Sequence, residues 1–294
     1  MIDLYSAIRE SNLFPKMEVS ELLFVEYTCM REETKLGFWS DRNYFAFIAS
    51  GKKAWRTARS TYEVIGGDIL FIKKGANLAH QFFEQEFCAI FIFIPDDFIR
   101  GFLRKHSGLT NAPTGDVSGQ DTVLRVEADA LLNSYGQSIR SYLSLAEKPR
   151  EELLLLKFEE LLLSLFHHDK HRCLADYFLS LTRDEEFHLE RIMEANFPYN
   201  LTLKDYARLC HMSLTTFKLA FRRHFGSTPA VWLRSRRLEL ARRKLLGTDM
   251  PVQDISLECG FEDTSHFIRV FKSRYEVTPL QYRQKHSRTA GAEN

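Results

Sequence analysis

Short apolar runs, separated by turn sequences, fill the first third of the chain. They are rich in Phe, Ile, Val and Tyr, and turns such as Gly66-Gly67-Asp68 lie between them. Runs of this length, bounded by Gly and Asn, are typical of β-strands. The expected strands cover residues 22–29, 44–51, 61–65, 69–72 and 87–94. Many short strands with glycine-containing turns predict a small barrel or a jelly roll.

The spacing of apolar residues becomes helical after residue 95. A helix is expected from Asp96, because the carboxylates of Asp96 and Asp97 suit a helix N-terminus, and two more helices are expected over residues 128–145 and 151–166. The last of these carries more apolar residues than one narrow face can hold, so it should be buried on more than one side. Two interpretations stay open. It packs on the barrel and the preceding helix, or it meets a second chain through Leu154, Leu155 and Leu162.

The C-terminal third contains one pattern twice, at an offset of 50 residues. Phe217, Phe221 and Trp232 in the first copy correspond to Phe267, Phe271 and Tyr282 in the second. Each copy reads as two short helices joined by a turn. Two copies are too few for a solenoid, and a tandem pair of helix-turn-helix units is the natural interpretation.

The second copy shows how such a unit would be built. Phe267 and Phe271 are spaced to face a core, and Gly260 permits the turn between the helices. Ser265, His266 and Arg269 are left on the outer face, which a helix-turn-helix unit places in the major groove of DNA. In the first copy, Ser213 is the expected N-cap of the second helix.

Residues 229–246, between the two copies, predict one long helix that begins at a proline. Its inward side is expected to carry Trp232, Leu238, Ala241 and Leu245. Basic residues surround the remainder: Arg234, Arg236, Arg237, Arg242, Arg243 and Lys244. The helix would fix the distance between the two outer faces, so that they enter successive major grooves about 34 Å apart.

Charge is divided unevenly between the two parts of the chain. Residues 187–294 hold 18 Lys and Arg against 11 Asp and Glu, a net charge of +7, whereas residues 1–186 carry a net charge of −6. The basic part is the part with the repeated pattern. Such an asymmetry is expected when one domain meets phosphate and the other does not.

Three ordered stretches in the basic part carry a specific resemblance. They read T-P-x-x-W-L-x-x-x-R-x-x-x-A-x-x-x-L, then I-S-x-x-C-G-F-x-D-x-S-x-F-x-R-x-F-K, then T-P-x-x-Y-R. In this order they resemble the AraC/XylS family of bacterial transcription regulators, over residues 187–285. The chain departs from the family pattern at Ser256, where Ala is usual, and at Glu276, where Gly is usual.

The resemblance implies which side chains face DNA. They are Leu214, Thr215, Lys218, Leu219 and Arg222 in the first unit, and Thr264, Ser265, His266 and Arg269 in the second. Lys218 and Arg269 can donate to guanine, and the methyl group of Thr215 can contact a thymine methyl. Ser265 and His266 could hold phosphate instead. Leu219 stands where a polar reader is common, so it contacts either thymine or nothing.

The N-terminal part carries a second resemblance. The segment G-G-D-I-L-F-I-K-K-G-A-N-L-A-H resembles the turn and strand of a cupin-like regulatory domain, which members of the family often contain. A metal-dependent cupin enzyme fused to a DNA-binding domain is the alternative. It needs several histidines and a carboxylate, but His80 is the only histidine before His106. We therefore expect no enzyme, no catalytic residue, no metal and no cofactor.

Cysteines and the N-terminus bear on the cellular compartment. The five cysteines are far apart and have no zinc-binding spacing, so we expect buried thiols in a reducing cytoplasm. The first ten residues lack the basic start and apolar core of a signal peptide.

These patterns predict an α+β multidomain protein. Its expected parts are a cupin-like β-barrel with packed helices for regulation and dimerisation (1–170), a linker (171–186), an all-α DNA-binding domain of two helix-turn-helix units (187–286) and a tail (287–294). The expected function is that of a sequence-specific transcription regulator, an activator rather than a repressor, which senses a small ligand or a protein. Its partners would be double-stranded DNA, RNA polymerase and a second copy. Short stretches also resemble regulators of type III secretion genes, some of which answer to an anti-activator protein.

Overall fold

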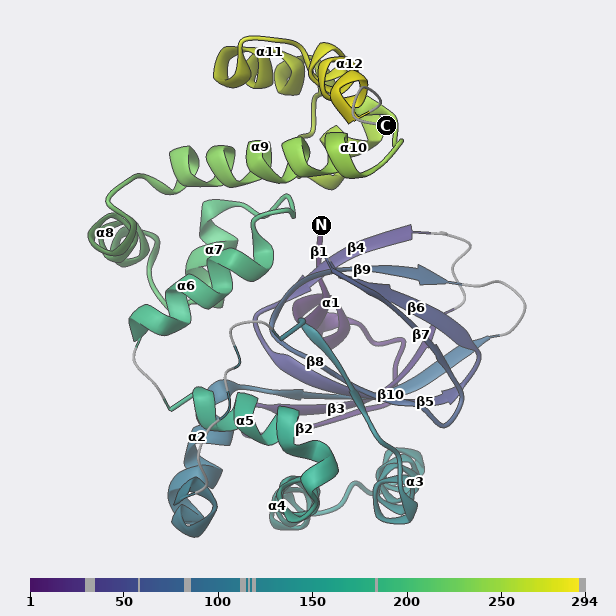
Figure 1. The fold of residues 1–294 in the computed structure, drawn as a ribbon. Helices are drawn as coiled ribbons and strands as arrows, with labels where there is room; N and C mark the ends of the chain where they lie inside the picture. The colour runs from purple at the N-terminus through teal and green to yellow at the C-terminus, as the bar shows by residue number, and fades with distance from the viewer. Residues whose placement is uncertain are drawn as a thin grey trace. The chain divides into compact units, whose positions relative to one another are not determined.

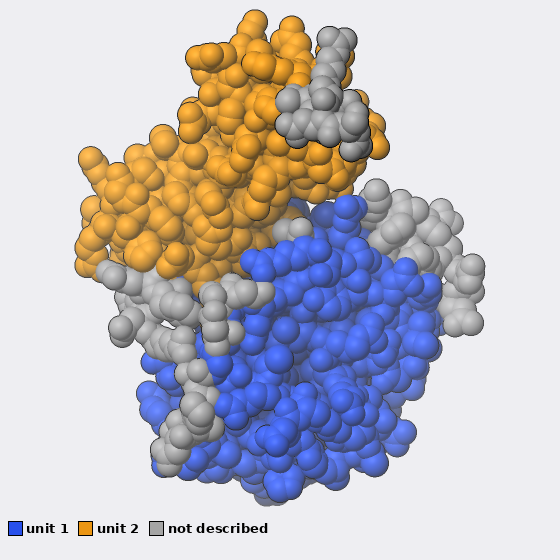
Figure 2. All heavy atoms as spheres, viewed as in Figure 1, with its two compact units in different colours: residues 1–188 blue, residues 189–294 orange. Residues whose placement is uncertain are grey.

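The computed structural model describes residues 1–29, 35–57, 59–81, 86–111, 115, 117, 120–182 and 185–290. It divides into two compact units, an N-terminal unit of Met1–His188 and a C-terminal unit of Leu189–Asn294 (Figure 2). The boundary falls within one helix.

The strands of the N-terminal unit form two sheets (Figure 1). A five-stranded sheet has the order β1-β4-β9-β6-β7, and a six-stranded sheet has the order β11-β8-β5-β10-β3-β2. The strands are β1 (Ile2–Asp3), β2 (Lys16–Val19), β3 (Leu22–Cys29), β4 (Lys35–Ser40), β5 (Asn43–Ser50), β6 (Lys52–Arg56), β7 (Thr61–Ile65), β8 (Ile69–Ile72), β9 (Gly75–Gln81), β10 (Phe87–Ile94) and β11 (Val123–Val126). The predicted strand-rich domain with packed helices is confirmed, but among the described strands no ladder joins the two sheets into a closed barrel. Of the two expected forms, a barrel and a jelly roll, only the second consists of two separate sheets, and the sheets here form a sandwich.

The N-terminal unit also contains helices α1 (Leu4–Glu10), α2 (Asp96–Lys105), α3 (Ala130–Ser144), α4 (Glu151–His167) and α5 (Arg172–Ser180), with short 3₁₀ turns η1 (Ser107–Asn111) and η2 (Asp169–His171). The three predicted helices are confirmed within two residues at each end. Helix α6 (Glu185–Asn196) crosses the boundary between the units.

Both faces of the six-stranded sheet are buried, which explains the continuous apolar runs of its central strands. In β5, Phe45 and Phe47 point toward helices α2 to α5, whereas Tyr44 and Ala46 point into the space between the two sheets. In β10 the isoleucines face the helices, and the residues that alternate with them, Phe87, Ala89, Phe91 and Phe93, face the other sheet. A strand covered on both sides needs apolar residues at successive positions, not at alternate ones.

The helix covering is what buries α4. Leu154 and Leu162 belong to the core between the helices and the six-stranded sheet, and Leu155 packs against that core. This is the first of the two interpretations that the sequence left open. The leucines that α4 does expose are Leu153, Leu156 and Leu163.

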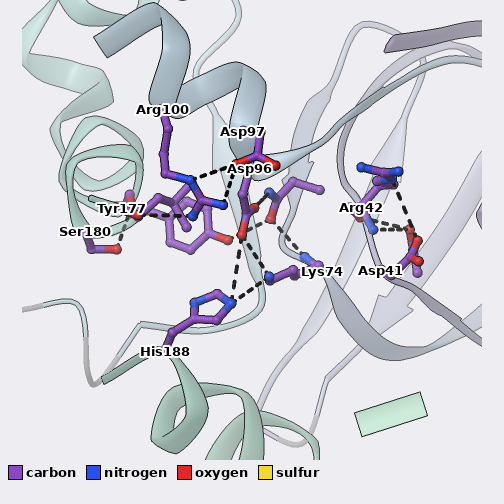
Figure 3. A network of polar contacts seen from close by, with 12 residues as sticks. Asp41, Arg42, Lys74, Asp96, Asp97, Arg100, Tyr177, Ser180 and His188 are labelled. Carbon is purple, nitrogen blue, oxygen red and sulfur yellow. Dashed lines mark hydrogen bonds and ion pairs between the residues drawn. The ribbon is translucent and has the colours of Figure 1, made fainter. Parts of the chain in front are cut away.

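A buried polar network fastens α2 to the sheet and to α5 (Figure 3). Asp96, the first residue of α2, accepts a hydrogen bond from Asn43 Nδ2 at 2.7 Å and pairs with Lys74 Nζ at 2.8 Å. The hydroxyl of Tyr177, in α5, donates to Asn43 Oδ1 at 2.7 Å, and His188 Nε2 lies 2.7 Å from Lys74 Nζ. These side chains therefore hold together the segment before β9, the start of α2, and α5. The two buried charges, on Lys74 and Asp96, neutralise each other.

The C-terminal unit is all helical. Its helices are α7 (Leu203–Leu209), α8 (Leu214–Phe225), α9 (Pro229–Gly247), α10 (Val252–Glu258), α11 (Thr264–Tyr275) and α12 (Pro279–Ala290), preceded by most of α6. The two predicted helix-turn-helix pairs are α7–α8 and α10–α11, and the long helix between them is α9. The offset is 49 residues between Cys210 and Cys259 but 50 between Phe217 and Phe267, because the second turn is one residue longer.

One departure from the predictions concerns a cysteine. Cys173 is exposed, although all cysteines were expected to be buried. His171, in the short turn η2 after α4, is buried, and burial lowers the pKa of its imidazole. The side chain of His80 lies outside the described part of the structure.

Candidate nucleic-acid interface

The first recognition helix, α8, separates its faces cleanly. Phe217 and Phe221 are fully buried, and aromatic contacts continue from Phe221 to Trp232 on α9. The outer face carries all five side chains that the sequence proposes for DNA contact: Leu214, Thr215, Lys218, Leu219 and Arg222. Leu219 is 68% exposed, which is a high value for an apolar side chain on an amphipathic helix. Its exposure favours an external contact over a role in the core.

The caps of α8 fix where this face begins and ends. The side chain of Ser213 accepts a hydrogen bond from the backbone N–H of Thr216, which confirms the predicted N-cap. Gly226 ends the helix in the left-handed conformation, with φ of 64°. Both are favoured arrangements for helix ends, so the orientation of the outer face follows from local sequence.

The second recognition helix, α11, is built on the same plan. Phe267 and Phe271 are buried, and Ser265, His266 and Arg269 are exposed. The carboxylate of Asp263 caps the helix by accepting from the backbone N–H of His266. Arg269 therefore projects from the middle of a well-anchored helix, where a guanidinium can reach a base edge.

Thr264 differs from the other proposed readers because it is half-buried. Its hydroxyl accepts a hydrogen bond from Ser256 Oγ at 3.4 Å, and Ser256 is fully buried on α10. The hydroxyl of Ser256, one of the two departures from the resembled family pattern, thus finds its partner on the recognition helix. A Thr264 hydroxyl used in this way is less available to DNA than the three exposed residues.

The internal repeat relates the two outer faces position by position. At an offset of 50, Leu219 corresponds to Arg269 and Arg222 corresponds to Lys272. Lys272 is exposed one turn beyond Arg269, and sequence reasoning did not propose it. The signal for it was present, because the repeat applied at Arg222 leads directly to it. At the position that Leu219 and Arg269 share in the repeat, the outer face of α8 is apolar, whereas that of α11 carries a guanidinium.

Several of the basic residues of α9 are engaged in ion pairs or hydrogen bonds within the C-terminal unit. Arg236 pairs with Glu194, Arg242 with Glu239 at 3.4 Å and Lys244 with Glu258 at 2.7 Å. Arg234 and Arg243 are exposed. Arg237 is turned toward backbone carbonyl groups of the same unit, which corrects its predicted place on the outer surface.

The thiol of Cys259 is shielded from solvent. The thiol is fully buried beneath α11, and burial raises its pKa to about 12. At neutral pH it is protonated, so it is neither a good nucleophile nor a metal ligand.

None of the described helices is both long and apolar enough to cross a membrane.

Comparison with known proteins gives two domain matches. Residues 43–177 match the ExsA N-terminal regulatory domain, and residues 206–285 match a helix-turn-helix domain. The virulence regulon transcriptional activator VirF of Yersinia enterocolitica is 28% identical over 244 residues, which cover 83% of this chain and 90% of that protein. The HTH-type transcriptional regulator ExsA of Pseudomonas aeruginosa is 27% identical over 237 residues, which cover 81% of this chain and 84% of that protein.

Among solved structures, ToxT of Vibrio cholerae aligns over 90% of this chain and 98% of that chain, at 16% identity and a TM-score of 0.44.

Proposed function

Because the chain belongs to the AraC/XylS family of transcription regulators, we propose that it binds specific duplex DNA through α8 and α11 and activates transcription from nearby promoters. The observation that carries this proposal is the pair of exposed, polar recognition faces in one helical unit with a net charge of +7 for residues 187–294. The activating sign rests on relatives that are named as transcriptional activators.

The chemistry of each face suggests what it reads. Arg269 can donate two hydrogen bonds to guanine O6 and N7, and Lys218 can donate to the same acceptors. Leu219 offers an apolar surface of the kind that contacts a thymine methyl group. Thr215, Ser265, His266, Arg222 and Lys272 can donate to phosphate or to base edges. The two faces would thus read unlike half-sites, so the full site should not be palindromic.

The two recognition helices belong to one unit, in which α8 precedes α9 along the chain and α11 follows it. We infer that they occupy successive major grooves on one side of the duplex, about one helical turn or 34 Å apart. Salt should weaken binding strongly, because Lys and Arg side chains release counterions from the phosphates they neutralise.

We propose that the N-terminal unit, residues 1–188, senses a small ligand or a partner protein and controls the DNA-binding unit. Its match to a regulatory domain and its helix-covered sandwich support this role. RNA polymerase would be the second partner, and a second copy could bind through the leucines that α4 exposes. A regulator of this kind needs no catalytic residue and works in the cytoplasm, where the chromosome lies.

The test begins with selection of duplexes from a random pool by the full chain. The expected product is a bipartite site with two unlike clusters about one turn apart, bound more weakly as salt rises. Recovery of no preferred sequence, or binding that ignores salt, would reject the proposal.

Single variants then assign the readers. Arg269→Ala should cost about 1–3 kcal/mol on the selected site and relax preference at one base pair. Lys218→Ala should do the same about one turn away. Arg243→Ala is the matched control: an exposed cation outside the recognition helices should weaken all sequences alike and lower the salt slope by roughly one. Should Lys218→Ala leave specificity intact, α8 holds phosphate only.

A further inference from the structure

The side chain of Arg237 joins three segments of the C-terminal unit. From α9, its Nε donates to the carbonyl of Phe197 at 2.8 Å, Nη1 donates to the carbonyl of Gly260 at 2.9 Å, and Nη2 donates to the carbonyl of Tyr199 at 2.8 Å. All three nitrogens of the guanidinium are used, and all three acceptors are backbone oxygens. Hydrogen bonds from a charged donor are shorter and stronger than neutral ones.

The three acceptors come from opposite halves of the unit. Phe197 and Tyr199 lie between α6 and α7 and lead into the first helix-turn-helix pair. Gly260 lies in the turn between α10 and α11, which aims the second recognition helix. One planar group on the connecting helix therefore holds the beginning of the first pair against the turn of the second.

Gly260 shows that this approach is close. Its φ is 81°, a conformation that favours glycine, and a Cβ at this position would lie 2.7 Å from the carbonyl oxygen of Pro198 and 3.0 Å from Arg237 Cζ. The two backbones therefore nearly touch beside the guanidinium. A hydrogen bond from Asn200 Nδ2 to Glu262 Oε1 joins the same two segments.

We propose that Arg237 is a positioning residue that sets the separation and relative rotation of α8 and α11, and thereby the spacing between half-sites that the protein accepts. A long helix can curve gently along its length. The three bonds of Arg237 add a second connection, off the axis of α9, and so remove that freedom. This inference rests on the proposed DNA-binding function.

A lysine at position 237 could not make the three hydrogen bonds of Arg237 with the same geometry. The guanidinium presents its donors in one plane and in fixed directions, whereas a lysine ammonium is a compact point charge on a flexible stem. Arg237→Lys keeps the charge and loses the planar three-way connection. Arg237→Gln loses both. If only charge mattered, the lysine variant would behave as the parent protein.

The first experiment measures spacing discrimination by the full chain. Dissociation constants are compared for the selected duplex and for duplexes with one or two extra base pairs between the half-sites. The parent protein should bind the lengthened duplexes at least about tenfold more weakly, which is the size of effect that a lost base-pair contact produces. For Arg237→Lys and Arg237→Gln this ratio should fall toward one.

Arg234 provides the matched control, because it lies three residues earlier on α9 and is exposed. Arg234→Lys and Arg234→Gln should change binding to all duplexes equally and keep the spacing ratio of the parent. An unchanged ratio in the Arg237 variants would overturn the proposal, as would an equal fall in the Arg234 variants.

The second experiment needs no DNA. Spin labels on unnatural amino acids at Thr216 and Ser273, both exposed on the recognition helices, report the distance between α8 and α11 by pulsed electron resonance. The parent should give one narrow distribution, and Arg237→Lys a broader or shifted one with helix content retained. Equal narrow distributions would overturn the clamp even if DNA binding is confirmed. If instead no specific duplex is found, the proposed function fails while this measurement still decides the role of Arg237.

Discussion

Equivalent residues of the repeat can share a backbone conformation without sharing a side chain. Gly226 and Glu276 end α8 and α11, and both lie in the left-handed region, with φ of 64° and 68°. Glycine adopts this region freely, but a residue with a Cβ pays in steric strain. Glu276 adds a negative charge at a helix C-terminus, where the dipole disfavours it. The departure seen in the sequence is therefore a strained position.

We expect Glu276→Gly to stabilise the C-terminal unit by about 0.5–1 kcal/mol, since it relieves the left-handed strain and removes the charge. Calorimetry of the full chain should show a higher melting temperature for the transition of that unit. Gly226→Ala is the control with opposite sign. An added Cβ there meets nothing within 4 Å, so only the backbone conformation opposes it. A lower melting temperature for Glu276→Gly would contradict the strain argument.

The placement of some of these residues could be predicted from the sequence, and that of others could not. The outer faces of α8 and α11 could be predicted because Phe217, Phe221, Phe267 and Phe271 fix the buried side by their spacing. The half-burial of Thr264 could not, since it depends on a hydroxyl eight positions away. Arg237 was placed wrongly because its partners are backbone carbonyls, which leave no trace in the sequence.

At the scale of elements, the strands that the sequence predicted were mostly those buried on both faces. The predicted strands β3, β5, β8 and β10 belong to the sheet with two covered faces, and each contains at least four successive apolar residues, whereas the short strands β2 and β11 of the same sheet were not predicted. In the five-stranded sheet only β7 was predicted. Strands such as β6, K-K-A-W-R, interleave basic residues with buried ones and read as loops until their partners are known. The tertiary pairing makes them strands.

The network at the start of α2 gives a prediction about how that helix is held. Asp96→Asn keeps the shape of the side chain but removes the carboxylate opposite Lys74, and both side chains are 1% exposed. Breaking a buried ion pair from one side costs about 3–5 kcal/mol. Denaturant unfolding of the N-terminal unit should show a loss of this size.

The neighbouring residue supplies the control for this experiment. Asp97 pairs with Arg100 at 2.8 Å, but its side chain is 79% exposed. Asp97→Asn should change stability by less than about 0.5 kcal/mol. Equal losses in the two variants would show that the network at Asp96 does not fasten the helix.

Helix α4 carries two kinds of leucine, and one variant of each separates folding from self-association. Leu162 is fully buried, so Leu162→Ala should destabilise the N-terminal unit by about 2–5 kcal/mol. Leu156 is 61% exposed, so Leu156→Glu should leave stability nearly unchanged and weaken self-association in sedimentation experiments. If the parent protein stays monomeric at high concentration, α4 is not a dimer surface.

At the scale of the whole chain, two units of different architecture carry opposite net charge. Residues 1–186 carry a net charge of −6 and residues 187–294 a net charge of +7. The net charge of +1 for the whole chain is therefore the sum of an acidic part and a basic part. The sequence predicted the strand-rich first part and the helical second part, and the helices were the easier to predict because their contacts are local and the pattern is repeated. It left the form of the first part open between a barrel and a jelly roll, since two facing sheets and a barrel place similar apolar runs along the chain.

The order of strands in the six-stranded sheet has a consequence for the time that the chain needs to fold. Strand β3 pairs with β10, and β8 pairs with β11, so partners are separated by roughly 50 to 70 residues of chain. Sheets with distant partners form slowly, whereas helical units with local contacts form fast. Refolding should therefore show a fast phase from the C-terminal unit and a slow one from the N-terminal unit. The three tryptophans can resolve them, because Trp39 and Trp55 lie in the slow unit and Trp232 in the fast one. Trp232→Phe should remove the fast fluorescence phase and keep the slow one.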